Sequence, residues 1–277
     1  MNKIKKTGAL IAIGTALFTG LFTVGSSATA KAAVKTYQVA VSTDSKPLSY
    51  KQNGKLTGYE VEVLKAVDKE LPNVKFKYHA VSQSAELVGL DSGKYDLASN
   101  GFYKNSEREK KYVFGDENDG LSLVKVYYNK AQFSKVPTDL DDLVGKVLAP
   151  VNANGGMYNL LTTWNNAHGD KQVTIKTTSG IPMQQLLNGV NTGKYDALID
   201  PSNLGEADII KQKKLTNVET SKPVRAFPTY FLFTKKNKTL AGQVDEALKK
   251  LKSDGTLKKY SIKYFGENVF NYKVKEN

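Results

Sequence analysis

Two similar phrases, SGKYDLAS at residues 92–99 and TGKYDALID at residues 192–200, stand one hundred residues apart in this chain. A helix-like stretch precedes each phrase, AELVGL at 85–90 and MQQLLNGV at 183–190. Gly93 and Gly193 are expected to end these helices, because a helix C-terminus needs the left-handed backbone that glycine adopts readily. Each phrase then enters a short apolar strand. One helix–strand unit is therefore predicted to occur twice, once in each of two similar lobes.

Strands and helices alternate along the rest of the chain. YQVAV at 37–41 has the composition of a first strand, and Asn53-Gly54 indicates a hairpin-type turn. This alternation predicts an α/β fold with two mixed, mostly parallel sheets. The remaining expected strands are 74–78, 95–99, 146–149, 173–176 and 197–199, and the expected helices are 57–71, 138–144, 157–165, 240–251 and 257–265.

Two long β runs, LSLVKVYY at 121–128 and the run at 230–233, do not fit a helix–strand repeat. We expect them to be a pair of strands that cross between the lobes and join the two sheets. Lobe 1 would then be discontinuous and comprise 34–119 plus 228–277, and lobe 2 would comprise 120–227.

Residues 1–33 have the three parts of a secretory signal peptide: a basic start, an apolar run over 8–24, and small residues with A-x-A spacing. Cleavage is expected after Ala30, Ala32 or Ala33. The alternative is a membrane anchor, but the apolar run is at the short limit for spanning a bilayer and contains glycine and threonine breaks. The chain has no cysteine, so it can be neither lipid-anchored through one nor disulfide-bonded. A secreted protein held together by its core alone is predicted.

The chain is strongly basic, with a formal net charge of +13. Cleavage would remove four lysines and no acid, which leaves a net charge of +9. An exported protein of this charge meets anionic wall polymers, lipid headgroups or host glycans first. Nucleic acid is not expected as a partner, because no recognised binding motif is present and export argues against it. The lysines are spread along the chain, so a solvated surface is the alternative explanation.

Little in the sequence suggests catalysis. His79 and His168 are the only histidines, and neither has a partner motif. There is no nucleophile elbow, Gly-rich phosphate loop or His-based metal motif, so no metal or cofactor is expected. Carboxylates alone can perform acid–base work, which leaves a small-acid dehydratase as a weak alternative.

The stretches after the first phrase carry a resemblance to a family. Their order and spacing resemble the extracellular solute-binding proteins (family 3 type) of polar amino-acid ABC importers. The matching stretches are Pro47-Leu48, GKLTGYEVE at 54–62, GKYD at 93–96, NSER at 105–108, FGD at 114–116 and the C-terminal LKSDGTLKKYSIKYFGE. The resemblance covers nearly all of the chain after residue 33. It implies a two-lobed, type II periplasmic-binding-protein-like fold, with a free amino acid as ligand and a membrane permease as partner.

The resemblance also implies two charged contacts to the ligand. Arg108 matches the family arginine, whose planar guanidinium binds a carboxylate with two hydrogen bonds. It is one of only two arginines in the chain, and the alternative is a solvated charge in EREKK. Asp200 matches the carboxylate that takes the ligand's ammonium, at the carboxyl end of a strand. The alternative for Asp200 is the N-cap of a helix that starts at Pro201.

Further ligand contacts are expected around these two residues. NGGM at 154–157 precedes a helix whose N-terminal N–H groups suit a carboxylate, and an ordinary Gly-rich turn is the alternative. Glu60 and Glu62 match a family acid pair or are helix-surface charges. The family's ring beside the Pro-Phe element is missing here, and Tyr50, Phe102 or Tyr103 would replace it. The full expected set adds Asn100, Gly101, Tyr103, Tyr50, Gln83, Asn154, Gly155, Gly156 and Met157 to the two charged residues.

These features predict a non-enzymatic receptor that captures an amino acid, with cystine or another polar one as candidates, for an ABC permease. The chain also resembles the basic, non-lipidated surface binding proteins of lactobacilli. That resemblance implies retention by charge on anionic wall polymers of a Gram-positive cell, and an adhesin for collagen, mucin or another extracellular polymer is the second hypothesis.

Overall fold

A computed structural model describes residues 33–153 and 155–275 of the chain. The predicted signal peptide lies outside the described residues, apart from Ala33. Within the described part, no helix is both long enough and apolar enough to cross a membrane. Four long helices are present there: α1 (Tyr59–Glu70), α4 (Gly156–Ala167), α7 (Lys238–Ser253) and α8 (Thr256–Phe265).

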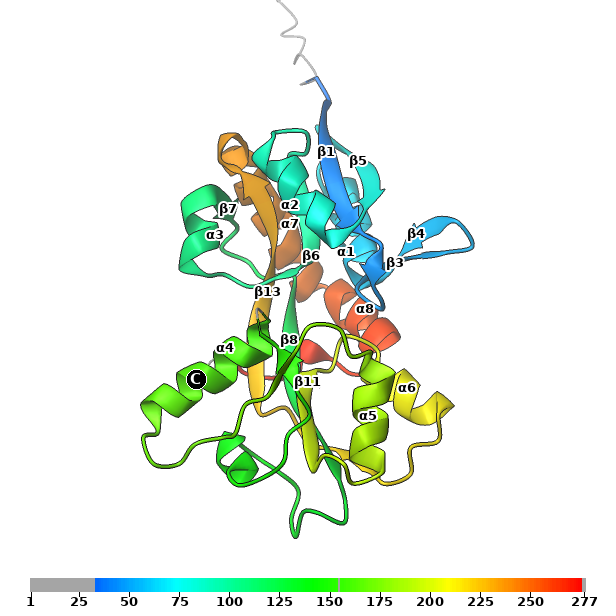
Figure 1. The fold of residues 1–277 in the computed structure, drawn as a ribbon. Coiled ribbons are helices and arrows are strands. Elements are labelled where there is room, and N and C mark those ends of the chain that lie inside the picture. The colour runs from blue at the N-terminus through cyan, green and yellow to red at the C-terminus, as the bar shows by residue number, and fades with distance from the viewer. Residues whose placement is uncertain (1–32, 154, 276–277) are drawn as a thin grey trace, which may run out of the picture. The chain divides into compact units, whose positions relative to one another are not determined.

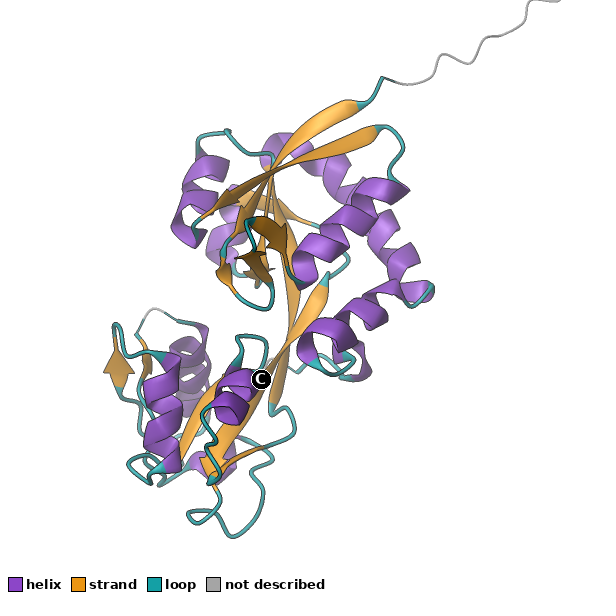
Figure 2. Ribbon diagram, turned by 90° about the vertical axis from the view of Figure 1, so that its right-hand side faces the viewer, coloured by secondary structure: helices purple, strands orange, loops and turns teal. Residues whose placement is uncertain are grey.

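The first lobe is built on three parallel strands. β1 (Lys35–Ser42) lies between β5 (Val74–Val81) and β6 (Leu97–Phe102). Val39 and Val41 of β1 pack in a core with α1 and α7, whereas Ala40 between them packs in a second core with α2 (Gln83–Asp91). Both faces of the sheet are therefore covered by helices (Figure 2), which explains why Val39, Ala40 and Val41 are apolar in succession.

Two long strands run side by side through the described chain, as the sequence predicted (Figure 1). β8 (Gly120–Asn129) pairs antiparallel with the first half of β13 (Arg225–Thr234). The second half of β13 pairs with β6 and with β7 (Tyr112–Phe114), after an irregularity at Tyr230–Leu232. One hydrogen-bonded path, β11-β8-β13-β6-β1-β5, therefore joins both lobes.

The second lobe departs from the expectation of a mostly parallel sheet. β11 (Ala197–Pro201) and β12 (Val218–Thr220) both pair antiparallel with β8. The strand expected at 146–149 is reduced to a single parallel bridge between Leu148 and Ala197. The strand expected at 173–176 is not formed, and the only parallel pair of strands within the described part of the second lobe is β9 (Val151–Asn152) with β10 (Thr177–Thr178).

The repeated phrase forms the same structure in both lobes. In the first copy, α2 ends at Asp91 and Gly93 adopts a left-handed φ of 71°. The Tyr95 N–H donates to the Gly89 carbonyl at 3.1 Å, which lays the tyrosine ring against that glycine. Asp96 then exchanges hydrogen bonds with Gln38 of β1: the Asp96 N–H donates to the Gln38 carbonyl, and the Gln38 N–H donates to the Asp96 carboxylate at 2.9 Å.

The second copy reproduces each of these contacts. α5 (Met183–Asn191) is followed by Gly193 with φ of 77°. The Tyr195 N–H donates to the Gly189 carbonyl at 3.2 Å, and the Asp196 carboxylate accepts the Val147 N–H at 2.8 Å. The Asp196 N–H in turn donates to the Val147 carbonyl at 2.8 Å. The prediction that one helix–strand unit occurs twice is confirmed in geometry as well as in sequence.

The C-terminal segment adds a third connection along the crossing strands. Lys275 forms a two-way backbone bridge with Ala226 of β13, and its ammonium pairs with Asp139 at 2.6 Å. Asp139 also accepts from Arg225, whose side chain is 3% exposed.

The lobe boundaries at 119/120 and 227/228 remain a prediction. The remaining elements are β2 (Asp44–Ser45), β3 (Ser49–Gln52), β4 (Lys55–Thr57), α3 (Ser106–Lys111), α6 (Glu206–Gln212), and the 3-10 turns η1 (Leu140–Leu143), η2 (Lys235–Asn237) and η3 (Val269–Asn271).

Candidate functional site

A cavity of about 1060 Å³ is lined by residues of both lobes. The ends of β6 and β11, the helix α3 and the N-terminus of α4 all contribute to it. Of the eleven residues expected from the sequence, the lining contains Gln83, Asn100, Gly101, Tyr103, Arg108, Gly155, Gly156, Met157 and Asp200. Asn154 lies outside the described residues, and Tyr50 does not line the cavity.

Arg108 is oriented from three sides. The Asn105 side chain caps α3 by accepting the backbone N–H of Arg108 at 2.8 Å. One guanidinium nitrogen donates to the Tyr103 carbonyl at 2.9 Å, and the guanidinium lies 5.3 Å from the centre of the Phe102 ring. Partial burial lowers the pKa of Arg108. No carboxylate of the described chain forms an ion pair with it, so its remaining N–H groups are open to an anion in the cavity.

Tyr103 connects both lobes at the floor of the cavity. Its hydroxyl donates to the Ser122 hydroxyl of β8 at 2.6 Å, and its ring lies 5.3 Å from the ring of Phe227 on β13. A methyl group at Gly156 on α4 would lie 3.5 Å from this ring. Burial raises the pKa of Tyr103 to about 12. Because the hydroxyl is engaged, Tyr103 presents its ring to the cavity.

Asn100 and Gly101 are each held by a hydrogen bond to another side chain. The Asn100 side-chain oxygen accepts from the Ser45 hydroxyl at 2.7 Å. The Gly101 N–H donates to Glu60 at 2.6 Å, so this N–H is not free for a ligand. Glu60 is fully buried, and the interpretation of Glu60 as a helix-surface charge is wrong. Burial, and then the charge of Asp119, raise the pKa of Glu60.

Asp200 faces the cavity from the end of β11. The alternative that it caps a helix starting at Pro201 is wrong, because α6 begins only at Glu206. Burial, and then the charge of Glu206, raise the pKa of Asp200 well above its ordinary value. No motif in the sequence indicated Glu206. It lies six residues after Asp200, at the start of α6, and only the fold places it beside Asp200.

The N-terminus of α4 supplies backbone donors to the same cavity. Gly155 is the N-cap residue and makes no side-chain cap, since it has no side chain. Gly156 and Met157 begin the helix and line the cavity. Uncapped N–H groups at the start of a twelve-residue helix favour a negatively charged group. The expected role of this loop is therefore consistent with where it lies.

The missing family ring is not replaced by Tyr50. Tyr50 lies on β3, paired with Asp44 and Thr57, and the Lys46 ammonium lies 5.7 Å from the centre of its ring. Instead, four other aromatic side chains contribute to the cavity: Phe102, Tyr103, Tyr158 and Phe227. Tyr158 and Phe227 were not identified from the sequence, because neither stands in a matched stretch.

The two histidines lie elsewhere. His79 shares a hydrogen bond with Gln38 at 2.7 Å, and His168 stacks on Trp164 with ring centres 4.2 Å apart. In the described residues, no group of three acidic, histidine or cysteine side chains is placed to hold a metal ion.

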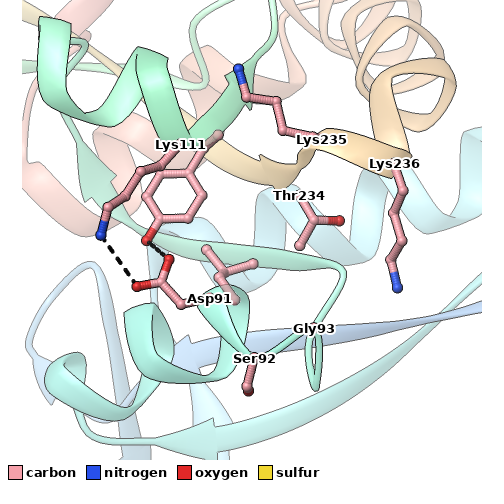
Figure 3. A pocket seen from close by; sticks show the side chains of 9 residues that line it. Asp91, Ser92, Gly93, Lys111, Thr234, Lys235 and Lys236 are labelled. Atoms are coloured by element: carbon pink, nitrogen blue, oxygen red, sulfur yellow. Dashed lines mark hydrogen bonds and ion pairs between the residues drawn. The ribbon is translucent and has the colours of Figure 1, made fainter.

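A second hollow, of about 530 Å³, lies on the first lobe (Figure 3). Three lysines line it, but each already has a partner within the chain. Lys111 pairs with Asp91, the Lys235 ammonium donates to a backbone carbonyl, and Lys236 pairs with Asp96. None of the expected site residues is there. The large cavity is therefore the candidate ligand site.

The two lobes are joined by crossing strands and enclose a cavity. This cavity carries a guanidinium that has no carboxylate partner, and a carboxyl. Together these features define a two-lobed solute-binding protein. Comparison with known proteins agrees. Residues 37–167 match the model of the bacterial extracellular solute-binding proteins, family 3. The chain belongs to this family, and it is a binding protein rather than an enzyme.

Several relatives cover most of the chain. The L-cystine-binding protein TcyJ of Bacillus subtilis is 34% identical over 221 residues, which is 78% of each chain. TcyK of the same organism, also an L-cystine-binding protein, is 31% identical over 229 residues and again covers 78% of each. The crystal structure of ytmK from B. subtilis, a probable amino-acid ABC transporter extracellular-binding protein, superposes with a TM-score of 0.72 at 28% identity and covers 84% of this chain and 98% of that one.

A structure from a study of glutathione import in Streptococcus mutans, via GshT and the cystine ABC importer TcyBC, is 31% identical with a TM-score of 0.66. It covers 85% of this chain and 97% of that chain. The type II periplasmic-binding-protein-like fold expected from the resemblance is confirmed.

Proposed function

We propose that this protein captures a free amino acid, with L-cystine as the first candidate, and delivers it to the permease of an ABC importer. The observation that carries the proposal is the pairing of opposite charges across one cavity. Arg108 from the first lobe is open to a carboxylate, and Asp200 from the second is open to an ammonium. An α-amino acid carries both groups on one carbon. Relatives named as cystine-binding proteins support the choice of ligand.

The remaining lining suits a disulfide-linked side chain. Aromatic rings and the thioethers of Met157 and Met183 give the cavity polarisable apolar walls, and sulfur makes favourable contacts with ring edges. The cavity volume, about 1060 Å³, exceeds what a small amino acid fills. Closure of the lobes would exclude water and strengthen the charged contacts. Micromolar binding, about −8 kcal/mol, is within reach of two charged contacts and apolar burial.

Calorimetry on the chain without residues 1–33 tests this proposal. L-cystine, the other common amino acids and glutathione are titrated in turn, and a saturable 1:1 isotherm with L-cystine is expected. Arg108→Lys keeps the charge but loses the planar fork, so binding should weaken roughly 10- to 100-fold, the equivalent of one charge-assisted hydrogen bond. Lys110→Ala, an exposed change on the same helix, is the control and should bind normally. Equal binding by Arg108→Lys and Lys110→Ala would refute the site.

We further propose that this extracellular protein is held at the surface of a Gram-positive cell by charge. The net charge of +9 after residue 33 and the absence of cysteine support this mode. Attraction between exposed charges is screened by salt, so washing cells with about 1 M salt should release the protein, and release by detergent alone would contradict it. Binding of the purified chain to collagen or mucin, with the same salt sensitivity, is the outcome that would favour the adhesin hypothesis.

A further inference from the structure

The carboxyl of Asp200 has a second carboxyl directly behind it. Glu206, the first residue of α6, is fully buried and does not line the cavity. The two carboxyls are close enough for the charge of Glu206 to act on Asp200. Asp200 Oδ2 and Glu206 Oε1 receive no N–H or hydroxyl donor from the rest of the described chain. Carboxyl oxygens only accept when ionised, so a hydrogen bond between the two requires a proton.

Within residues 33–153 and 155–275, no lysine or arginine forms an ion pair with Asp200 or Glu206. The Tyr127 hydroxyl of β8 hydrogen-bonds to Glu206, and the Leu204 N–H donates to it at 3.3 Å. Lys125, opposite Asp200 on β8, is engaged with Glu267 at 2.5 Å. Tyr103 and Arg108 follow β6, and α6 itself carries Asp208 and Lys211, both exposed. Asp208 forms an ion pair with Lys46.

A buried carboxyl pair without a cation resists double ionisation. Burial raises the pKa of Glu206 to about 7, and burial, followed by the charge of Glu206, raises the pKa of Asp200 well above its ordinary value. The pair therefore holds at least one proton in the empty site near neutral pH, and a second one in mild acid.

We propose that Asp200 and Glu206 act as one proton-sharing acid pair, and that capture of the substrate's α-ammonium displaces a proton from this pair to solvent. This inference rests on the proposed function. Asp200 contacts the ammonium, and Glu206 is a positioning residue that acts through Asp200. The balance is simple: in mild acid, the empty pair carries two protons and no charge. When the ammonium arrives, the Asp200 O–H bond breaks, the proton leaves to buffer, and the carboxylate pairs with the ammonium. Glu206 keeps its own proton and donates it to Asp200.

The proposal links affinity to pH in a definite direction. Because the empty site holds more protons than the filled one, affinity rises with pH, by up to about tenfold per pH unit. The rise in affinity ends at the pH where the empty pair has already released one of its two protons. Uptake would thus be favoured where the medium is near neutral and disfavoured in acid.

Proton release is measured by titrating L-cystine at about pH 5.5–7.0 in two buffers of different ionisation enthalpy, below the range in which an α-amino group titrates. The unmodified protein should release up to about one proton per site. Glu206→Gln supplies a permanent amide donor to Asp200, so it should bind L-cystine with little proton release and nearly pH-independent affinity. Asp208→Asn makes the same carboxyl-to-amide change at an exposed position of α6 and should behave like the unmodified protein.

Tyr127→Phe provides a second variant if Glu206→Gln does not fold. The Tyr127 hydroxyl lowers the pKa of Glu206, so its loss should move the proton-release window to higher pH. No net proton release by the unmodified protein, or equal release by unmodified protein and Glu206→Gln, would overturn the acid-pair proposal. L-cystine binding itself at pH 7 tests the proposed function separately, because a pH-independent isotherm would refute the pair and leave the receptor role standing.

Discussion

The repeated helix–strand unit predicts an unusual sensitivity at one glycine in each copy. Gly89 lies in α2 and Gly189 in α5, and in each case a tyrosine ring from the same phrase lies over the glycine. A methyl group at Gly189 would come within 2.6 Å of the Tyr195 ring, and one at Gly89 would come still nearer to the ring of Tyr95. Both distances are shorter than real carbon contacts, so alanine at either position must displace a ring.

The size of the effect follows from two opposed contributions. Replacing glycine by alanine inside a helix stabilises it by about 1 kcal/mol, whereas forcing an extra carbon into a packed core costs about 1–3 kcal/mol. Tyr95 is 3% exposed, so its ring has no solvent into which to move, and the cost should lie toward the upper end. We expect Gly89→Ala and Gly189→Ala to lower the free energy of unfolding by about 1–2 kcal/mol, with Gly89→Ala the larger effect.

Gly242 of α7 is the matched control, because a methyl group there meets nothing within 4 Å. Gly242→Ala should stabilise the protein by about 0.5–1 kcal/mol. Urea unfolding of all three variants measures the differences as midpoint shifts at unchanged slope. Fluorescence of Trp164, the single tryptophan, reports the second lobe, and circular dichroism reports both. If Gly89→Ala and Gly189→Ala stabilise the protein as much as Gly242→Ala does, the inferred ring contact is wrong.

Two further predictions concern charges at the crossing strands. Burial, and then the charge of Asp119, raise the pKa of Glu60. The stability that Glu60 contributes is therefore fully present below its ordinary pKa and is lost as pH rises through the pKa in the folded state. Glu60→Gln stays neutral, so its free energy of unfolding in urea should fall less between about pH 5 and 9 than that of the unmodified protein. An equal loss would show that Glu60 is not the titrating group. Asp139→Ala should cost about 3 kcal/mol in urea unfolding because it leaves the buried Arg225 guanidinium unpaired. Lys275→Ala, in which the lost lysine side chain is 47% exposed, should cost less than about 1 kcal/mol, and a reversed order would contradict this interpretation.

Local signals in the sequence were sufficient for much of the fold. Gly93 and Gly193 end their helices with left-handed backbone, and Asn53-Gly54 forms the hairpin turn between β3 and β4 with φ of 50° and 75°. Such signals are readable because the backbone conformation depends on the residue itself and its immediate neighbours. The crossing strands were also predicted, because the two long β runs do not fit the helix–strand repeat.

The errors arose where a distant group decided the outcome. The strand expected at 146–149 makes only the bridge between Leu148 and Ala197, because a strand needs a partner that lies elsewhere in the chain. Tyr50 was a reasonable candidate ring by type, but its strand pairing holds it away from the cavity. Asp200 was assigned an alternative cap role from Asp-Pro-Ser, and the chain instead continues for five residues before the next helix.

By itself, the amino-acid sequence determined the two-fold helix–strand unit, the α/β class and the candidate charged residues Arg108 and Asp200, because periodicity, turn chemistry and motif order are local properties of a chain. Tertiary structure alone decided which buried acids lie next to the site residues. Glu60 accepts the Gly101 N–H, and Glu206 lies beside Asp200. These pairs bring together residues whose contact depends on how strands and helices pack. Burial then raises the pKa of Glu60, Asp200 and Glu206, and that electrostatic consequence exists only once the chain has folded and water has been excluded.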